Sequence, residues 1–384
     1  MDRLGRGLGG RRRWLSNAAA LSGLWVVSGG CYYGAEEGEA YEPWLYPGAD
    51  LRPDRLVVGA AILASSPHNT QPWWMRATAN RVDFFSDASR NLGSLDGLLR
   101  ELTIGLGCAL ENGLIAARAF GLAPELALFP SGDDPAHIAT VTLGRGTPMR
   151  DPLFDAIPHR HTYRGRMMDD PPPEDLEAAL AALCEADVRL TFVDRGDKKH
   201  VFRSETIAAT EAIVADRSML LDGDAWWRQT AEDIERHRDG VTIDTSGLGA
   251  ATRALGKMAG RPSPESSGEY WLSATREVHT RASAFVILST ANRADRAAQV
   301  AVGRTYQRIH LWATSQGLAV QPLNQLPERQ DREQVTGAEP RAQRVLATLI
   351  GDDRTGAQML FRIGFAFDEA LKSPRRPYEW VVRP

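Results

Sequence analysis

Two segments of the chain repeat the same order of elements, and this repeat constrains the fold more than any other feature. The stretches "GLGCALENGLIAARAFGLAPELALFP" and "VGRTYQRIHLWATSQGLAVQPL" each run as a buried helix, a Gly-Leu cap and an extended apolar segment. Strand-like segments flank both copies in the same order. The repeat predicts an internal duplication of one α+β unit. Two such units would pack as a pseudo-dimer, the intrachain counterpart of a twofold homodimer.

The predicted domains follow from where these elements begin and end. Residues 54–150 hold a helix, a strand over "RVDFFSD", the first repeated helix and two further strands, and form the first unit. Residues 151–384 form the second unit, interrupted at 218–272 by a stretch of charges, glycines and tryptophans. Such an insertion is typical of a lid or partner-contacting arm, or of a loosely ordered one. Residues 32–53 are predicted to be a connector.

Residues 1–31 differ in character from the rest of the chain. An arginine run, Arg11 to Arg13, precedes a short apolar stretch, and small residues lead to Cys31. This order resembles a twin-arginine export signal, which implies a twin-arginine translocase as a partner. The glycines before Cys31 also suit a lipid anchor on that cysteine. We therefore expect an exported protein, periplasmic or anchored on the outer face of the membrane; the alternatives are a basic cytoplasmic tail and a wrongly assigned start.

Composition and missing motifs exclude several classes of protein. The net charge is −4 and no basic stretch is interleaved with aromatic residues, so no nucleic-acid partner is expected. The three cysteines include no CxxC pair, and no ligand at zinc spacing accompanies His159 and His161, so no metal site is predicted. GxGxxG, P-loop, GxSxG and HExxH motifs are all absent.

The loop "ASSPHNTQPWW" carries the densest set of ligand-binding groups. Two neutral amides, Asn69 and Gln71, offer donors and acceptors together, as needed to bind a heteroaromatic edge with alternating C=O and N–H groups. Pro72 ends any preceding helix, and Trp73 supplies an apolar wall. No group in this loop suits a phosphate, so it is expected to form only part of a site.

Two basic turns supply the missing cations. The turn "PHRHTYRG" contributes two guanidiniums, an imidazole and a hydroxyl, from Arg160, His161, Thr162 and Arg164. Arginine binds phosphate through paired N–H groups. A second turn, stiffened by prolines, holds Arg375 and Arg376. Each turn alone is typical of a solvated surface, but together they predict one anion held from two sides.

These motifs resemble the nitroreductase superfamily of flavin enzymes, and specifically its duplicated, Acg-type branch. The resemblance is carried by "SSPHNTQPW", "RELTIGLGCALENG", "HRHTYRG", "GLAVQPL" and "IGFAFDEALKSPRRP", and so covers most of the chain beyond residue 50. It implies a nitroreductase-like α+β fold with FMN at the interface of two units. Each copy keeps a complementary half of the site, so one FMN per chain is expected.

The resemblance also implies which residues approach FMN. Its ring or ribityl chain would contact the first unit at Ser65, Ser66, Asn69 and Gln71. Its phosphate would be held by the second unit at Arg160, His161, Thr162 and Arg164, with Arg375 or Arg376 completing the clamp. The ring face and its redox-active nitrogen would lie against Pro322, Leu323 and Asn324.

The predicted function is therefore an FMN-dependent oxidoreductase of nitroreductase type. It would pass two electrons from NAD(P)H or another donor to a small-molecule acceptor that is nitroaromatic, quinone-like or otherwise conjugated. The flavin carries the redox step, so no catalytic side chain is predicted. The alternative is a protein that sequesters FMN under a lid with little or no turnover. Export would place the protein where NAD(P)H is scarce, which favours another donor.

Overall fold

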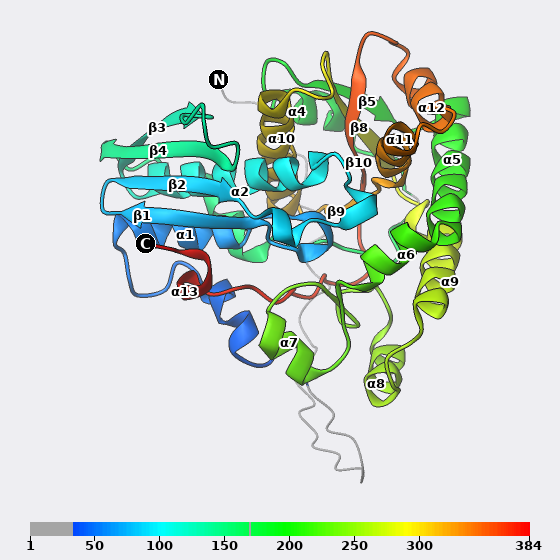
Figure 1. Ribbon diagram of the computed structural model, residues 1–384, viewed down its shortest axis with the longest axis horizontal. Coiled ribbons are helices and arrows are strands. Elements are labelled where there is room, and N and C mark those ends of the chain that lie inside the picture. Colours follow the sequence, from blue (N-terminus) through cyan, green and yellow to red (C-terminus); the bar gives the residue numbers. More distant parts are fainter. Residues whose placement is uncertain (1–33, 169) are drawn as a thin grey trace. The chain divides into compact units, whose positions relative to one another are not determined.

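Two four-stranded antiparallel sheets share one topology (Figure 1). The computed structural model describes residues 34–168 and 170–384. The first sheet has the order β1-β2-β4-β3 and the second β5-β8-β10-β9, so in both the fourth strand of the unit lies between its second and third. The predicted α+β, nitroreductase-like fold class is confirmed, and the shared strand order is consistent with the predicted tandem copies of one unit. The unit boundaries at residues 54, 150 and 151 stay predictions.

The strands follow the apolar runs of the sequence. The first sheet consists of β1 (Trp73–Thr78), β2 (Arg81–Ser86), β3 (Leu122–Leu128) and β4 (His137–Arg145). The second sheet consists of β5 (Arg189–Val193), β8 (Ala284–Thr290), β9 (Ala319–Pro322) and β10 (Gly356–Gly364). A parallel pair in the insertion is formed by β6 (Trp227–Arg228) and β7 (Val241–Thr242). Every residue of β8 is buried, which explains its continuous apolar sequence.

Helices surround these sheets and form the insertion. In the first half they are α1 (Pro53–Ile62), α2 (Arg100–Ala119) and α3 (Pro152–Ala156). The second half contains α4 (Leu176–Ala181), α5 (Gly196–Ala215), α10 (Arg296–Ser315), α11 (Gln325–Thr336), α12 (Arg341–Ile350) and α13 (Tyr378–Val381). The insertion is mostly helical, with α6 (Arg217–Asp224), α7 (Ala231–His237), α8 (Ala250–Met258) and α9 (Pro264–Ala274).

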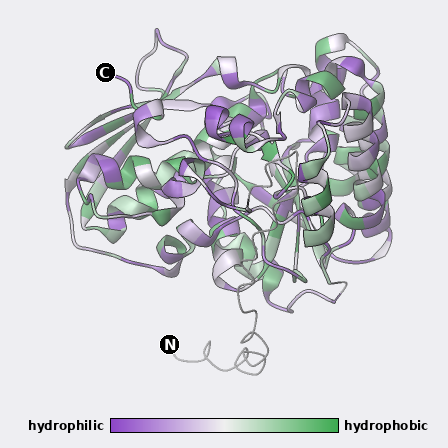
Figure 2. Ribbon diagram, turned by 90° about the horizontal axis from the view of Figure 1, so that it is seen from below, coloured by the Kyte–Doolittle hydropathy of each residue, from purple (hydrophilic) through white to green (hydrophobic). Residues whose placement is uncertain are grey.

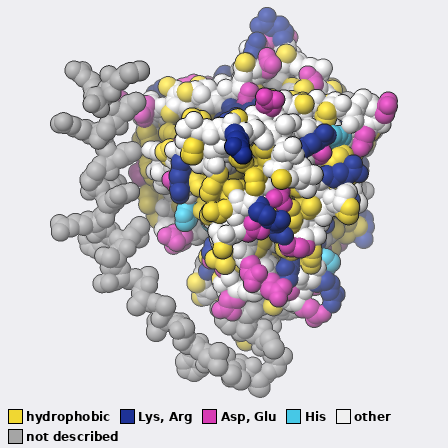
Figure 3. Space-filling model, turned by 90° about the vertical axis from the view of Figure 1, so that its left-hand side faces the viewer, with side chains coloured by type: hydrophobic (Ala, Val, Ile, Leu, Met, Phe, Trp, Pro, Cys, Tyr) yellow, Lys and Arg dark blue, Asp and Glu magenta, His cyan; other side chains and the backbone are white. Residues whose placement is uncertain are grey.

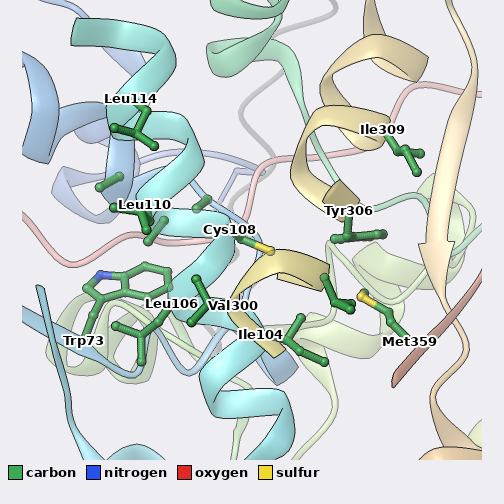
Figure 4. Close-up of a cluster of buried hydrophobic side chains, with 14 of the residues drawn as sticks. Trp73, Ile104, Leu106, Cys108, Leu110, Leu114, Val300, Tyr306, Ile309 and Met359 are labelled. Carbon is green, nitrogen blue, oxygen red and sulfur yellow. The ribbon is translucent and has the colours of Figure 1, made fainter. Parts of the chain in front are cut away.

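The two repeated helices, α2 and α10, cross at a pair of glycines. Gly107 and Gly303 occupy the same position, seven residues after the first residue of each helix. A Cβ on Gly107 would collide with the carbonyl oxygen of Val300, and one on Gly303 with the carbonyl oxygen of Ile104. Backbone therefore packs directly on backbone, and the reciprocal contacts are those expected of a pseudo-twofold relation. Figure 4 shows the hydrophobic side chains gathered around this crossing.

Buried polar contacts fix how α2 and α10 pair. Glu111 of α2 is 2% exposed, and its carboxylate accepts from Arg304 at 2.8 Å and from Arg308 at 2.6 Å. The amide of Gln307 donates to Asn112 at 2.8 Å. Because a buried ion pair is costly to break, these contacts favour this one register of the two helices.

The surface alternates polar and apolar groups. The helices at the right-hand edge of Figure 2 change between hydrophilic and hydrophobic residues along their length, as expected of helices with one solvent-facing side. On the face seen in Figure 3, cationic and anionic side chains are interspersed, with hydrophobic side chains between them. This face carries no broad area of positive charge.

The predicted export signal and the lipid anchor at Cys31 lie outside the described residues and stay predictions. Among the helices in residues 34–384, none is long and apolar enough to cross a membrane.

The crossing of α2 and α10 generates a stability prediction. Gly303→Ala is expected to lower the free energy of unfolding by about 2 kcal/mol. Overpacking against a rigid backbone costs about 3 kcal/mol, and alanine recovers about 1 kcal/mol of helix propensity. Urea unfolding measures the change as a lower midpoint at constant slope. The control is Gly249→Ala, where a Cβ would meet no atom within 4 Å; an equal loss in both variants would contradict the close crossing.

Candidate functional site

A cavity of about 490 Å³ is lined by residues from both units and from the insertion. The first unit contributes the loop after α1 and one side of α2, including Ser65, Ser66, Glu101 and Cys108. The second unit contributes the basic turn, α10, the end of β9 and the segment that follows it, including Thr162, Arg164, Tyr306, Pro322 and Asn324. The volume of the cavity falls in the range of about 300–1,000 Å³ typical of cofactor and ligand pockets.

The loop after α1 has an unusual backbone. His68, Asn69 and Gln71 take left-handed φ values of 43°, 57° and 51°, which side chains other than glycine rarely adopt. The hydroxyl of Ser66 accepts from the backbone N–H of Gln71 at 3.0 Å and helps to hold this shape. Each such residue costs about 1–2 kcal/mol, and strain of this kind concentrates at functional sites.

The two amides of this loop bind protein groups. Asn69 accepts from the Arg375 guanidinium and donates to the carbonyl of Pro374 at 2.9 Å. Gln71 donates to the carbonyl of Arg238 at 2.8 Å, and its Oε1 accepts from the backbone N–H of Arg376 at 2.8 Å. Gln71 is fully buried and lines neither pocket of the site, so its side chain binds protein groups in this structure, and the expectation that it binds a heteroaromatic edge stays a prediction. The amides tie the insertion and the C-terminal turn to the loop.

A small polar pocket adjoins the cavity, with which it shares Ser65, Ser66, Thr162 and Arg164. Asn69, Arg160 and Arg375 complete most of its polar lining. Both basic turns predicted from the sequence therefore contribute an arginine to one pocket. They meet because Arg375 lies over the first-unit loop, where its guanidinium donates to Asn69 and to the carbonyl of Ala64 at 3.4 Å. Its backbone N–H also donates to the carbonyl of Ala40 in the connector at 2.7 Å.

Among the described residues these three arginines have no carboxylate partner, and Arg160 and Arg375 are buried while Arg164 is half-buried. Arg160 and Arg375 are each 2% exposed, and Arg160 donates to the carbonyl of Leu63 at 3.0 Å. Arg164 donates to the carbonyl of Thr245 at 3.0 Å. The Nε atoms of Arg160 and Arg375 have no hydrogen-bond partner. Carbonyls satisfy single N–H groups here but leave the positive charge uncompensated.

The arginine pKa values reflect this uncompensated charge. Burial lowers the pKa of Arg160 and lowers that of Arg164 to about 10. Burial and then the charge of Arg160 hold the pKa of Arg375 well below its usual range. Because three cations crowd a dry pocket, a ligand with two negative charges would relieve both desolvation and mutual repulsion. The geometry suits a phosphate monoester.

Three other predicted residues lie elsewhere. His161 lines neither pocket and packs edge-on against Trp44 with ring centroids 4.5 Å apart. Burial holds the pKa of His161 well below its usual value, so its ring is neutral and cannot supply a cation to a phosphate. Leu323 is 1% exposed in the core of the second unit. Arg376 donates to the carbonyls of Gln71 and Trp73, so only Arg375 of that turn reaches the pocket.

The sequence reasoning missed several residues of the site. His68 lines the cavity, where burial and then the charge of Arg164 lower its pKa to about 4. Arg362 is 0% exposed and donates to Gln321 and to the carbonyl of Gly165, both at 2.7 Å, so it holds the basic turn against β9. The sequence did carry a signal for Arg362, because a lone arginine inside the apolar strand "MLFRIGF" indicates a buried charge with a specific partner.

The insertion forms an aromatic wall of the cavity. Its contribution includes Met219, Trp226, Trp227, Tyr270 and Trp271. The ammonium of Lys257 on α8 is 2.8 Å from the Asp244 carboxylate, which joins two parts of the insertion. Aromatic side chains of this kind suit a planar ligand.

Comparisons with known proteins agree with the resemblance found in the sequence. No protein-family model matches the chain. The chain is 28% identical over 341 residues to "Putative NAD(P)H nitroreductase acg" of Mycobacterium tuberculosis, covering 85% of this chain and 94% of that protein. A second "Putative NAD(P)H nitroreductase" of the same organism is 28% identical over 346 residues, covering 87% and 92%. The resemblance to Acg-type nitroreductases is thus confirmed.

Two solved structures also align with part of the chain. An FMN-bound nitroreductase from Desulfitobacterium hafniense is 14% identical, with a TM-score of 0.38, over 62% of this chain and 99% of the other. The FMN-dependent nitroreductase NfnB from Mycobacterium smegmatis, in complex with NADPH, is 17% identical, with a TM-score of 0.37, over 60% and 97%.

The uncompensated arginines generate a prediction about anions. Inorganic phosphate is expected to raise the Tm of the ligand-free protein relative to chloride at equal ionic strength, by roughly 1 °C for each kcal/mol of binding. Arg164→Met removes one buried charge, so the variant should be at least as stable without phosphate and lose most of the response. Exposed Arg166 provides the control as Arg166→Met. An unchanged phosphate response in Arg164→Met would contradict the anion site.

Proposed function

We propose that the protein is an FMN-dependent oxidoreductase of the nitroreductase type. The carrying observation is the cluster of buried, carboxylate-free arginines beside a cavity lined by both units. Arg160, Arg164 and Arg375, with the hydroxyl of Thr162, would hold the FMN phosphate in the small pocket. Bound there, the flavin supplies two-electron redox chemistry, and the protein orients it and tunes its electronics.

The cavity offers a place for the flavin ring next to the phosphate pocket. Ser65 and Ser66 line both spaces, so they would contact FMN between its ring and its phosphate. Pro322 and Asn324 line the cavity from the other unit. Of the residues that the resemblance implied, these fit an FMN site, whereas Gln71, His161, Leu323 and Arg376 fit structural roles; all of these assignments remain proposals.

One FMN per chain follows from the asymmetry of the two units. The first unit supplies the strained loop, and the basic turn belongs to the second. The second unit holds no copy of "NTQPW", and the first holds no basic turn ahead of its repeated helix. Only one combination of loop and turn is therefore complete.

We propose NAD(P)H as the electron donor and a conjugated small molecule, such as a nitroaromatic or a quinone, as the acceptor. The names of the relatives in Mycobacterium tuberculosis support a nicotinamide donor. If residues 1–31 direct export, as their sequence predicts, an electron donor available outside the cytoplasm would take the place of NAD(P)H.

A second function is favoured by the insertion. Because Trp226, Trp227 and Trp271 form one wall of the cavity, the insertion would cover a bound flavin and restrict access to it. A protein built in this way could sequester FMN with little turnover. The two functions share the cofactor site and differ in whether reductant and acceptor reach it.

The phosphate assignment is tested by Arg160→Ala combined with Arg164→Ala. Each truncation removes a buried charge contact worth about 2 kcal/mol, so the FMN dissociation constant should rise about 10³-fold. The FMN dissociation constant is measured by flavin fluorescence titration of the ligand-free protein, and Arg166→Ala is the matched control. Circular dichroism confirms that each variant folds. Full retention of FMN in the double variant would remove this assignment.

Enzyme and sequestering protein are distinguished by reduction of the FMN-loaded protein. In a stopped-flow experiment, an oxidoreductase with a nicotinamide donor is expected to lose its oxidised flavin absorbance rapidly with NADPH. Bleaching by dithionite alone would favour sequestration or another donor. A colourless protein that cannot be reconstituted with FMN would contradict both functions.

A further inference from the structure

One carboxyl group on the cavity wall has no role in holding FMN. Glu328 lies on the first turn of α11, four residues after Asn324, so the two side chains share one side of the helix. Both line the cavity. Glu328 is 5% exposed, and its Oε2 atom has no hydrogen-bond partner. A buried carboxyl oxygen without a partner is costly unless a bound molecule or a proton satisfies it.

No cation among the described residues forms an ion pair with Glu328, although the nearby charge of Arg100 acts to lower its pKa. Asp331 of α11 accepts from Arg100 of α2 at 2.8 Å and also pairs with Arg293. Glu101 accepts from Arg100 at 3.0 Å. Both guanidiniums are therefore engaged by other carboxylates.

A fourth carboxyl group adds to the negative charge of this cluster. Asp96 is fully buried, and its carboxylate accepts from the backbone N–H groups of Glu101 and Leu102, both at 2.9 Å. Asp96, Glu101, Glu328 and Asp331 thus share the two guanidiniums of Arg100 and Arg293. Because four buried carboxyl groups share two cations, their mutual repulsion favours a proton on at least one of them.

The proton is expected on Glu328, the carboxyl group of this cluster with the fewest hydrogen-bond and ion-pair partners. Burial and then the charge of Glu101 raise the pKa of Glu328 well above its usual value. Burial also raises the pKa of Glu101 to about 7 despite the nearby Arg100. Since the pKa of Glu328 is raised, its neutral form predominates at neutral pH and is lost as the pH rises. The result is an O–H donor on the wall of the proposed flavin cavity.

We propose that Glu328 is the proton donor to the acceptor in this oxidoreductase. Reduction of a quinone to a hydroquinone needs two electrons and two protons. A reduced flavin bound in the cavity would supply the two electrons and one proton together as a hydride. The second proton comes from Glu328, whose O–H bond breaks as the new O–H bond of the product forms.

The cycle is completed when the Glu328 carboxylate takes a proton from water that enters as the product leaves. Glu101, which also lines the cavity, disfavours the anionic form of Glu328 through its own negative charge and so promotes reprotonation. The inference rests on the proposed function, because it needs a reduced flavin in the cavity.

The first experiment compares two acceptors on the FMN-loaded, prereduced protein. Menadione accepts a hydride and a proton, whereas ferricyanide accepts electrons alone. Glu328→Gln keeps the shape of the side chain but lacks the acidic proton. In the variant, we expect menadione to oxidise the reduced flavin about 10²-fold more slowly than in the wild-type protein, which is within the usual range for loss of a general acid. Ferricyanide should oxidise it at the wild-type rate.

A matched control lies on the same helix. Glu333 is 7% exposed, and its carboxylate accepts from the backbone N–H of Ala342 at 2.9 Å, away from the cavity. Glu333→Gln should leave the ratio of the two rates unchanged. Equal slowing of Glu328→Gln with both acceptors would indicate a structural role and overturn the proposal.

The pH profile of the wild-type protein tests the proposal even if the variant does not fold. The rate at which menadione oxidises the reduced flavin should fall as the pH rises, because Glu328 loses its proton. The rate of oxidation by ferricyanide should stay constant. In the folded variant the menadione profile should be flat. A wild-type ratio of the two rates that does not change with pH would overturn the proposal.

A readout without the cofactor completes the test. The infrared spectrum of the ligand-free protein at neutral pH should show the C=O band of a protonated carboxyl group, weakened in Glu328→Gln and unchanged in Glu333→Gln. An unchanged band in Glu328→Gln would overturn the proposal. FMN binding and flavin reduction are measured separately from flavin oxidation. A protein that binds no flavin would contradict the proposed function. A flavin that is reduced normally, but whose oxidation by the two acceptors is slowed equally in Glu328→Gln, would contradict only the role of Glu328 as proton donor.

Discussion

The crossing of α2 and α10 is the constraint on which the rest of the structure depends. At Gly107 and Gly303 the two backbones touch, so neither helix can shift without opening the core shared by the units. The same helices also shape the cavity, because Cys108 of α2 and Tyr306 of α10 line it. Close packing thus sets the distance between the strained loop of one unit and the basic turn of the other.

The site departs from what stability alone would select. Arg160 and Arg375 are buried and Arg164 is half-buried, all without carboxylate partners among the described residues, and a carboxyl cluster beside the cavity carries more acids than bases. Loop residues with left-handed φ add strain. Features of this kind weaken a fold unless a ligand compensates them, and here they collect around one cavity. The concentration of unfavourable groups is the strongest physical indication that this cavity is built to bind and not only to pack.

Positive and negative groups are separated within the site. Arg160 and Arg375 line only the small pocket and Arg164 lines both spaces, whereas Glu101 and Glu328 line only the larger cavity. This separation suits a cofactor with an anionic end and a redox-active ring, and it keeps a neutral acid beside the ring's proposed position. The insertion adds an aromatic wall, so access and chemistry are governed by different parts of the chain.

The sequence by itself determined the α+β class, the repeated topology, the burial of α2 and the residue types of the loop and the basic turn. These features are local, since periodicity and turn chemistry act over a few residues. Only the tertiary structure decided that Arg375 and not Arg376 reaches the pocket, that Gln71 binds backbone groups, and that Glu328 lacks a cation. The partners of these side chains come from segments far apart in the chain, and burial and charge pairing are properties of that assembled environment.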